Sequence, residues 1–135
     1  MQTLPLGLAP VSIPEDTGSI SVTLPAGAVV GQVVARVQFR NGYRPFLTFI
    51  GNAVAAALAG VITWRVKCDG TLMLPYFDTL GQWAPPESPD REITPYRELP
   101  QNAVLTIECD ATAASPGGLV TARIMGIYAA VQGGS

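Results

Sequence analysis

The chain has 135 residues, enough for one domain with a real core, and it is 48% hydrophobic but only 13% charged. A net charge of −2 with the basic residues scattered excludes binding by phosphate neutralisation, so we expect no nucleic-acid partner. Because histidine is absent, and no nucleotide-binding or nucleophile motif is present, we expect no enzyme activity, cofactor or metal.

Residues 1–18 form an apolar stretch that Pro5, Pro10 and Pro14 interrupt. Such a sequence cannot form a regular helix or a central strand, so it predicts an extended N-terminal arm. The arm lies either over its own domain or over a neighbouring subunit. No basic region precedes a continuous apolar run here, so no secretory signal is predicted. The apolar side chains of the arm are candidate contact residues: Leu4, Leu6, Leu8, Val11 and Ile13.

Three strands are predicted before residue 51. Residues 19–24 alternate between apolar and polar side chains, and residues 32–39 do the same after a turn. A turn of the Asn-Gly type follows at residue 41, and residues 46–50 read as a short strand. In the second strand one face is expected to carry Val33, Ala35, Val37 and Phe39.

The next segment, residues 52–59, is rich in alanine and predicts one or two turns of helix. Asn52 would cap this helix and Gly60 would end it. The uncharged run 46–64 has about the length of a spanning helix. Its glycines, Asn52 and alanines make its transfer into lipid weak, so we do not expect a membrane protein.

The centre of the predicted core is a hairpin at residues 61–74. Its first strand places Ile62, Trp64, Val66 and Cys68 on one face, and polar side chains on the other. Asp69-Gly70 then supplies a two-residue turn, because both residues tolerate positive φ.

Residues 78–89 form a long proline-rich loop with Trp83 near its middle. Loops of this length usually contact a partner, so we expect a contact loop, with Trp83 folding back on its own domain as the alternative. The aromatic residues Tyr76, Trp83 and Tyr96 are candidate interface anchors or a sugar-binding platform. Arg91 and Arg97 are expected to pair with carboxylates at the rim of the contact.

Two further strands are predicted at residues 104–109 and 119–131, where Gly126 marks a bulge or a close approach. The strand-end acids Asp69, Glu108 and Asp110 are more simply solvated than Ca²⁺ ligands. Cys68 and Cys109 are either two buried thiols or a disulfide, and the pattern leaves both open.

The complete pattern predicts an all-β, single-domain β-sandwich of jelly-roll type with about eight strands and one short helix near residues 52–59. The sandwich domain would span residues 19–131, followed by a flexible tail at 132–135.

Four features together resemble small β-sandwich accessory proteins of bacteriophage virions, such as capsid decoration or cement proteins and single jelly-roll coat proteins. They are the arm, the Trp64 strand with its Asp69-Gly70 turn, the turn at residues 99–102, and the closing segment 122–128. The resemblance implies a non-enzymatic structural protein on the capsid surface. Its partners would be other capsid subunits and copies of itself. The alternative is a carbohydrate- or receptor-binding module, such as a viral fibre tip.

Overall fold

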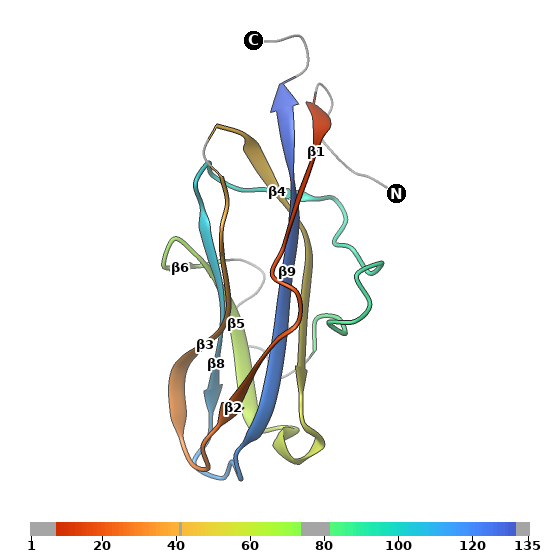
Figure 1. Cartoon of the computed structure of the whole chain (residues 1–135). Helices are drawn as coiled ribbons and strands as arrows, with labels where there is room; N and C mark the ends of the chain where they lie inside the picture. The colour runs from red at the N-terminus through yellow and green to blue at the C-terminus, as the bar shows by residue number, and fades with distance from the viewer. Residues whose placement is uncertain (1–7, 41, 74–81, 132–135) are drawn as a thin grey trace.

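A computed structural model describes residues 8–40, 42–73 and 82–131, which fold into two antiparallel sheets packed face to face (Figure 1). The prediction of an all-β sandwich is confirmed. The first sheet, sheet A, contains β1 (Leu8–Asp16), β2 (Ile20–Leu24), β4 (Arg44–Val54), β7 (Arg97–Glu98) and β9 (Gly118–Val131). The second, sheet B, contains β3 (Val29–Gln38), β5 (Ile62–Cys68), β6 (Thr71–Leu72) and β8 (Val104–Ala111).

The strands pair in a nested order along the chain. β9 pairs with β1 and β2, β8 with β3, β7 with β4, and β6 with β5, all antiparallel. β4 also pairs with β9, and β5 with β8, which gives the orders β1-β9-β4-β7 and β3-β8-β5-β6. Because β4 overlaps both β1 and β2 in register along β9, β1 and β2 lie together on the other side of that strand.

The predicted central hairpin is confirmed as β5 and β6. Ile62, Trp64 and Val66 are buried between the sheets, while the intervening side chains are partly exposed. Asp69 and Gly70 have φ of 52° and 84°, the conformation for which the Asp-Gly pair was predicted. β8 alternates in the same way, so the core lies between the facing apolar sides of these strands.

The alternation predicted in β3 is confirmed for Ala35, Val37 and Phe39, which lie in or against the core, but it is wrong at Val33. The register between β3 and β8 shifts twice, between Val29 and Gln32 and between Val33 and Ala35. As a result Val34 and Ala35 are both buried, and Val33 is 40% exposed. A bulge of this kind moves the following side chains to the other face of the strand, which alternation alone does not reveal.

The helix predicted at residues 52–59 is reduced to a single 3-10 turn, η1 (Ala56–Leu58). Asn52 does not cap it, because residues 52–54 continue β4 and pair with β9. Sheet pairing overrides the helix propensity of alanine here. The uncharged run 46–64 is thus divided between two strands and a turn. In the described ranges no helix is long and apolar enough to cross a membrane.

Sheet A begins at residue 8, inside the segment predicted as an arm. β1 pairs with β9 at its two ends, and its register shifts between Pro10 and Pro14. Prolines are tolerated there because β1 is an edge strand. Residues 1–7 and the predicted tail at 132–135 lie outside the described residues.

The close approach predicted at Gly126 is confirmed. A Cβ atom added at this position of β9 would lie 2.7 Å from Cε1 of Phe39 and 2.8 Å from the carbonyl oxygen of Phe46. The glycine therefore allows β9 to pack closely against the ring of Phe39 and the backbone of the neighbouring strand β4.

Candidate functional site

The loop of residues 82–96, here called the edge loop, runs along the free edge of β4 (Figure 1). The Asn52 N–H donates to the carbonyl of Ala84 over 3.0 Å, and the Ile93 N–H donates to the carbonyl of Thr48 over 2.9 Å. β7 covers the remaining part of the same edge. The loop thus protects a long strand edge that would otherwise be open to pairing with other chains.

Asn52 is the main attachment point of the edge loop. Its side-chain Oδ1 accepts from the Trp83 N–H, and its carbonyl accepts from Gln82 Nε2, both over 2.8 Å. Asn52 itself is only 1% exposed, and both bonds are part-buried. Together with the bond to Ala84, one strand residue fixes three successive loop residues.

Trp83 packs against the core. Its ring meets the ring of Trp64 edge to face, with centroids 6.3 Å apart and planes at 61°. It belongs to the partly buried residues around the main core cluster. Its position therefore matches the alternative in which the loop folds back on its own domain.

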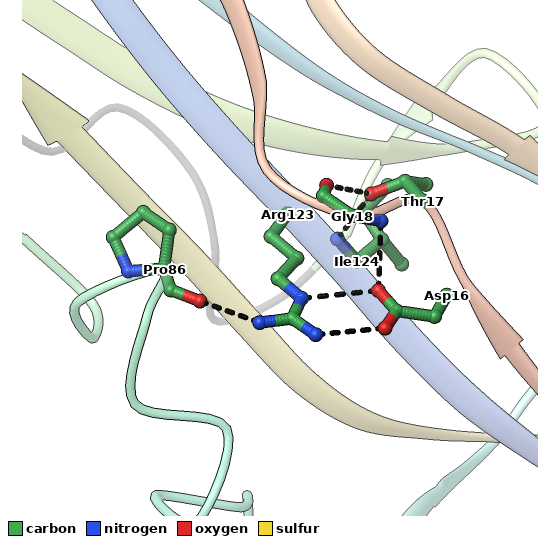
Figure 2. A network of polar contacts seen from close by, with 6 residues as sticks. All are labelled: Asp16, Thr17, Gly18, Pro86, Arg123 and Ile124. Atoms are coloured by element: carbon green, nitrogen blue, oxygen red, sulfur yellow. Dashed lines mark hydrogen bonds and ion pairs between the residues drawn. The ribbon is translucent and has the colours of Figure 1, made fainter.

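Arg123 connects the edge loop to the N-terminal segment across β9 (Figure 2). Its guanidinium donates to both carboxylate oxygens of Asp16, over 3.0 and 2.7 Å, and Nη1 donates to the carbonyl of Pro86 over 2.9 Å. The Gly18 N–H also donates to Asp16. The hydrogen bond from Arg123 is the main cause that lowers the pKa of Asp16.

The joint between β1 and β2 is held by a second set of bonds. Thr17 exchanges two hydrogen bonds of 3.0 Å with the backbone of Ile124, one through its N–H and one through its hydroxyl. The hydroxyl of Tyr128 donates to Glu15 and accepts from the Arg40 N–H. Burial and then the bond to Glu15 raise the pKa of Tyr128 to about 12.

Tyr96 lies in a separate small cluster on the outer face of sheet A, with Phe46 and Ala129. It is 7% exposed, and its hydroxyl donates to Glu92 over 2.8 Å. Burial is the first cause that raises its pKa to about 12. Because Tyr96 and Trp83 belong to different clusters, the structure does not bring them together as one platform.

The other predicted contact residues are dispersed. Arg91 is exposed on the edge loop, and Arg97 is partly buried on β7 opposite Leu47. Three of the predicted arm residues are part of β1, and the other three candidates lie outside the described residues. Those in β1 are Leu8, Val11 and Ile13, and those outside are Leu4, Leu6 and Tyr76.

A cavity of about 240 Å³ lies between the end of β4, η1 and the start of β5. The cavity is lined by the amide-bearing residues Asn52 and Gln82 and by apolar residues, and no described lining residue is charged. It therefore suits a small neutral group better than an ion. Its lining residues are Asn52, Ala53, Val54, Leu58, Ala59, Gly60, Ile62, Trp64 and Gln82.

Two of the three strand-end acids, Glu108 and Asp110, pair with Arg65. Arg65 binds Asp110 through two hydrogen bonds of 2.8 and 2.9 Å, and its Nε lies 3.3 Å from Glu108. The hydrogen bond from Arg65 is the main cause that lowers the pKa of Asp110. Asp69 accepts from the Val104 N–H in its turn. Among the described residues no three metal-ligating side chains come together.

Cys68 and Cys109 are free thiols. Cys68 lies opposite Leu105 and Cys109 opposite Trp64, so the two cysteines are separated by four residues along β8. That spacing corresponds to roughly 13 Å, which is beyond the reach of a disulfide. Of the two alternatives left open by the sequence, the structure therefore supports separate thiols.

The sequence pattern missed Asn52 and Arg123 as organising residues. The only unusual feature of Asn52 in the sequence is that it is an amide within a long uncharged run, and we interpreted it as a helix cap. For Arg123, the sequence showed only that it lies on the polar side of the last strand. Neither signal identifies the loop carbonyl or amide that each one binds.

Comparisons with protein-family models, with curated proteins and with solved structures found no significant match.

Proposed function

We propose that this chain is a non-enzymatic structural protein of a virion, of the capsid decoration or small coat type, with a jelly-roll fold. The observation that carries the proposal is the nested strand order. With β1 and β2 counted as one interrupted strand that pairs with β9, β3 pairs with β8, β4 with β7 and β5 with β6. A hairpin rolled up in this way gives the eight-strand, two-Greek-key arrangement typical of viral capsid domains, if β1 and β2 count as one interrupted strand.

The composition supports the same proposal. With 13% charged residues, the surface has few groups that favour water over a protein neighbour. Jelly rolls also occur in lectins and cupins, so the fold alone does not choose among these functions.

The proposed contacts to neighbouring subunits are the N-terminal segment and the loop at residues 78–89. The described part of this loop is held by Asn52 and Arg123, and it presents Glu87 and the adjacent Asp90 and Arg91 to solvent. A loop fixed in advance loses little conformational entropy on binding. Its exposed charges suit the polar rim of an interface.

The test is quantitative mass spectrometry of purified particles of the virus whose genome encodes the chain. We expect a fixed number of copies per particle that remains after washing in high salt, because apolar contacts resist salt. A chain found in infected cells but missing from intact particles would refute the proposal. A non-structural virus-encoded protein should be absent from the same particles and serves as the control.

A neutral carbohydrate is the second candidate partner, and the uncharged cavity is the observation that favours it. The residues that line the cavity include Gln82, which carries an amide, and the apolar Trp64 and Ile62. This is the combination that sugar sites use. Binding on a glycan array that is lost in Gln82→Ala and kept in Arg91→Ala would support it. No binding by the folded protein to any glycan would reject it.

A further inference from the structure

The side chain of Arg123 holds two segments that are far apart in the sequence (Figure 2). Its Nε and Nη2 donate to the two carboxylate oxygens of Asp16, at the end of β1, over 3.0 and 2.7 Å. Its Nη1 donates to the carbonyl of Pro86, in the edge loop, over 2.9 Å. One planar group therefore binds the N-terminal segment on one side and the edge loop on the other.

The two bonds to Asp16 fix the direction of the third bond. A guanidinium is planar and its N–H groups point in fixed directions, so a carboxylate that accepts from two of them sets the plane of the whole group. The Gly18 N–H orients that carboxylate in turn, because it donates to Asp16 over 2.8 Å. Without Asp16 the guanidinium would gain rotational freedom, and holding Nη1 at the Pro86 carbonyl would then cost side-chain entropy.

Sheet A has a place for Pro86 beside Arg123. Gly51 of β4 pairs with Arg123 of β9, and paired residues point to the same face of a sheet. Because Gly51 has no side chain, Pro86 lies directly over it, and a Cβ added at Gly51 would come 2.9 Å from Cα of Pro86. A proline has no N–H to donate, so its carbonyl is the backbone group by which the sheet can bind it.

The bond from Arg123 lies between two attachments of the edge loop to β4. One of these attachments is at Asn52, and the other is the bond that the Ile93 N–H donates. In between, the Ser88 and Arg91 N–H groups donate to carbonyls of the loop itself. Arg123 therefore fixes the middle of the edge loop to the sheet.

We propose that Arg123 couples the N-terminal segment to the edge loop, so that the loop opens more readily when Asp16 is released. A partner that draws the N-terminal segment away from β9 would loosen the edge loop. A partner that fixes the edge loop would strengthen the hold on Asp16, because coupling through one shared group is reciprocal. The use of this coupling in an assembly rests on the proposed function, whereas the coupling itself belongs to the isolated chain.

The test is amide hydrogen exchange of the full chain followed by NMR, which reports local opening residue by residue. The probes in the edge loop are the N–H groups of Trp83 and Ile93, which donate to Asn52 and Thr48. In Asp16→Ala both N–H groups should exchange at least about threefold faster than in the wild type.

The matched control is Asp110→Ala on sheet B. Asp110 also binds an arginine, Arg65, through two hydrogen bonds and accepts from a glycine N–H, so the change removes comparable contacts. Because these contacts lie on sheet B, exchange at Trp83 and Ile93 should stay at the wild-type rate. Equal acceleration in the two variants would show general destabilisation and refute the coupling.

Arg123→Met tests whether the coupling passes through the guanidinium. Methionine keeps an apolar stem and removes the charged group. Adding Asp16→Ala to this variant should therefore cause no further change at Trp83 or Ile93. A further acceleration of the same size as in the wild-type background would refute the role of Arg123.

Gly51→Ala tests the coupling from the other side, and it replaces Arg123→Met if that variant does not fold. The added Cβ would push against Pro86, so the Thr17 N–H, which donates to Ile124 at the joint between β1 and β2, should exchange faster. If the Trp83 N–H exchanges faster while the Thr17 N–H does not, the coupling is refuted.

These outcomes are separate from the test of the proposed function. A chain that is absent from particles can still show the coupling, and a chain without the coupling can still be a particle component.

Discussion

Replacing Gly126 with alanine tests how closely β9 packs against Phe39 and against the backbone of the neighbouring strand β4. The added Cβ would lie 2.8 Å from the carbonyl oxygen of Phe46 and 2.7 Å from the ring of Phe39. Ordinary contact begins near 3.4 Å, so a neighbour must move by about half an ångström. One of these neighbours is backbone, which cannot turn aside as a side chain can.

Overpacking of this kind costs about 1–3 kcal/mol. The backbone obstacle places Gly126→Ala near 3 kcal/mol, and the lower entropy of the unfolded alanine chain offsets about 0.4–1 kcal/mol. We therefore expect a net loss of about 2 kcal/mol. For a chain of this length, the loss corresponds to a fall in Tm of roughly 6–10 °C.

The assay is urea unfolding followed by tryptophan fluorescence, which reports on the core through Trp64. The control is the double variant Gly126→Ala with Phe39→Leu. The smaller side chain removes the two ring contacts, so the alanine should cost about 1 kcal/mol less in that background. A single variant within about 0.5 kcal/mol of the wild type would refute the close packing described for β9.

Three further predictions concern the edge loop, Tyr128 and the two thiols. Asn52→Ala removes the acceptor of the part-buried Trp83 N–H and should destabilise the protein by about 1–3 kcal/mol. Limited proteolysis should then cut the edge loop faster, whereas the exposed Thr94→Ala should leave the cutting rate unchanged. The pKa of Tyr128 is raised from 10.0 to about 12, so its stabilising effect is complete below pH 10 and lost as the pH rises towards 12. The free energy of unfolding should therefore fall across this range, and less steeply in Tyr128→Phe; an equal slope in both proteins would contradict this. A thiol reagent should modify the partly exposed Cys68 in the native protein and the buried Cys109 only after unfolding. A reductant should leave the Tm unchanged, and a lowered Tm would show that the two cysteines are bonded.

The parts of the fold that the sequence predicted depend on residues that are close along the chain. Alternation in β5 and β8, and the Asp69-Gly70 turn, follow from neighbours two residues apart. The tight packing at Gly126 was predicted in the same way, because a lone glycine inside an apolar strand often marks a bulge or a close approach of another backbone. The all-β class followed from these elements together.

The candidate site was only partly predicted. The loop around Trp83 was identified as a distinct element, but the sequence did not say that it lies along β4 and packs against Trp64. Tyr96 was grouped with Trp83 because both are aromatic, yet the sandwich places them in separate clusters.

Only the tertiary structure decided which strands pair, where β3 bulges and what Asn52 and Arg123 bind. Arg123 meets Asp16 across more than 100 positions of the chain, and β9 pairs with β1 at its far end. Bonds of this range depend on how the whole chain closes, and no local period encodes them.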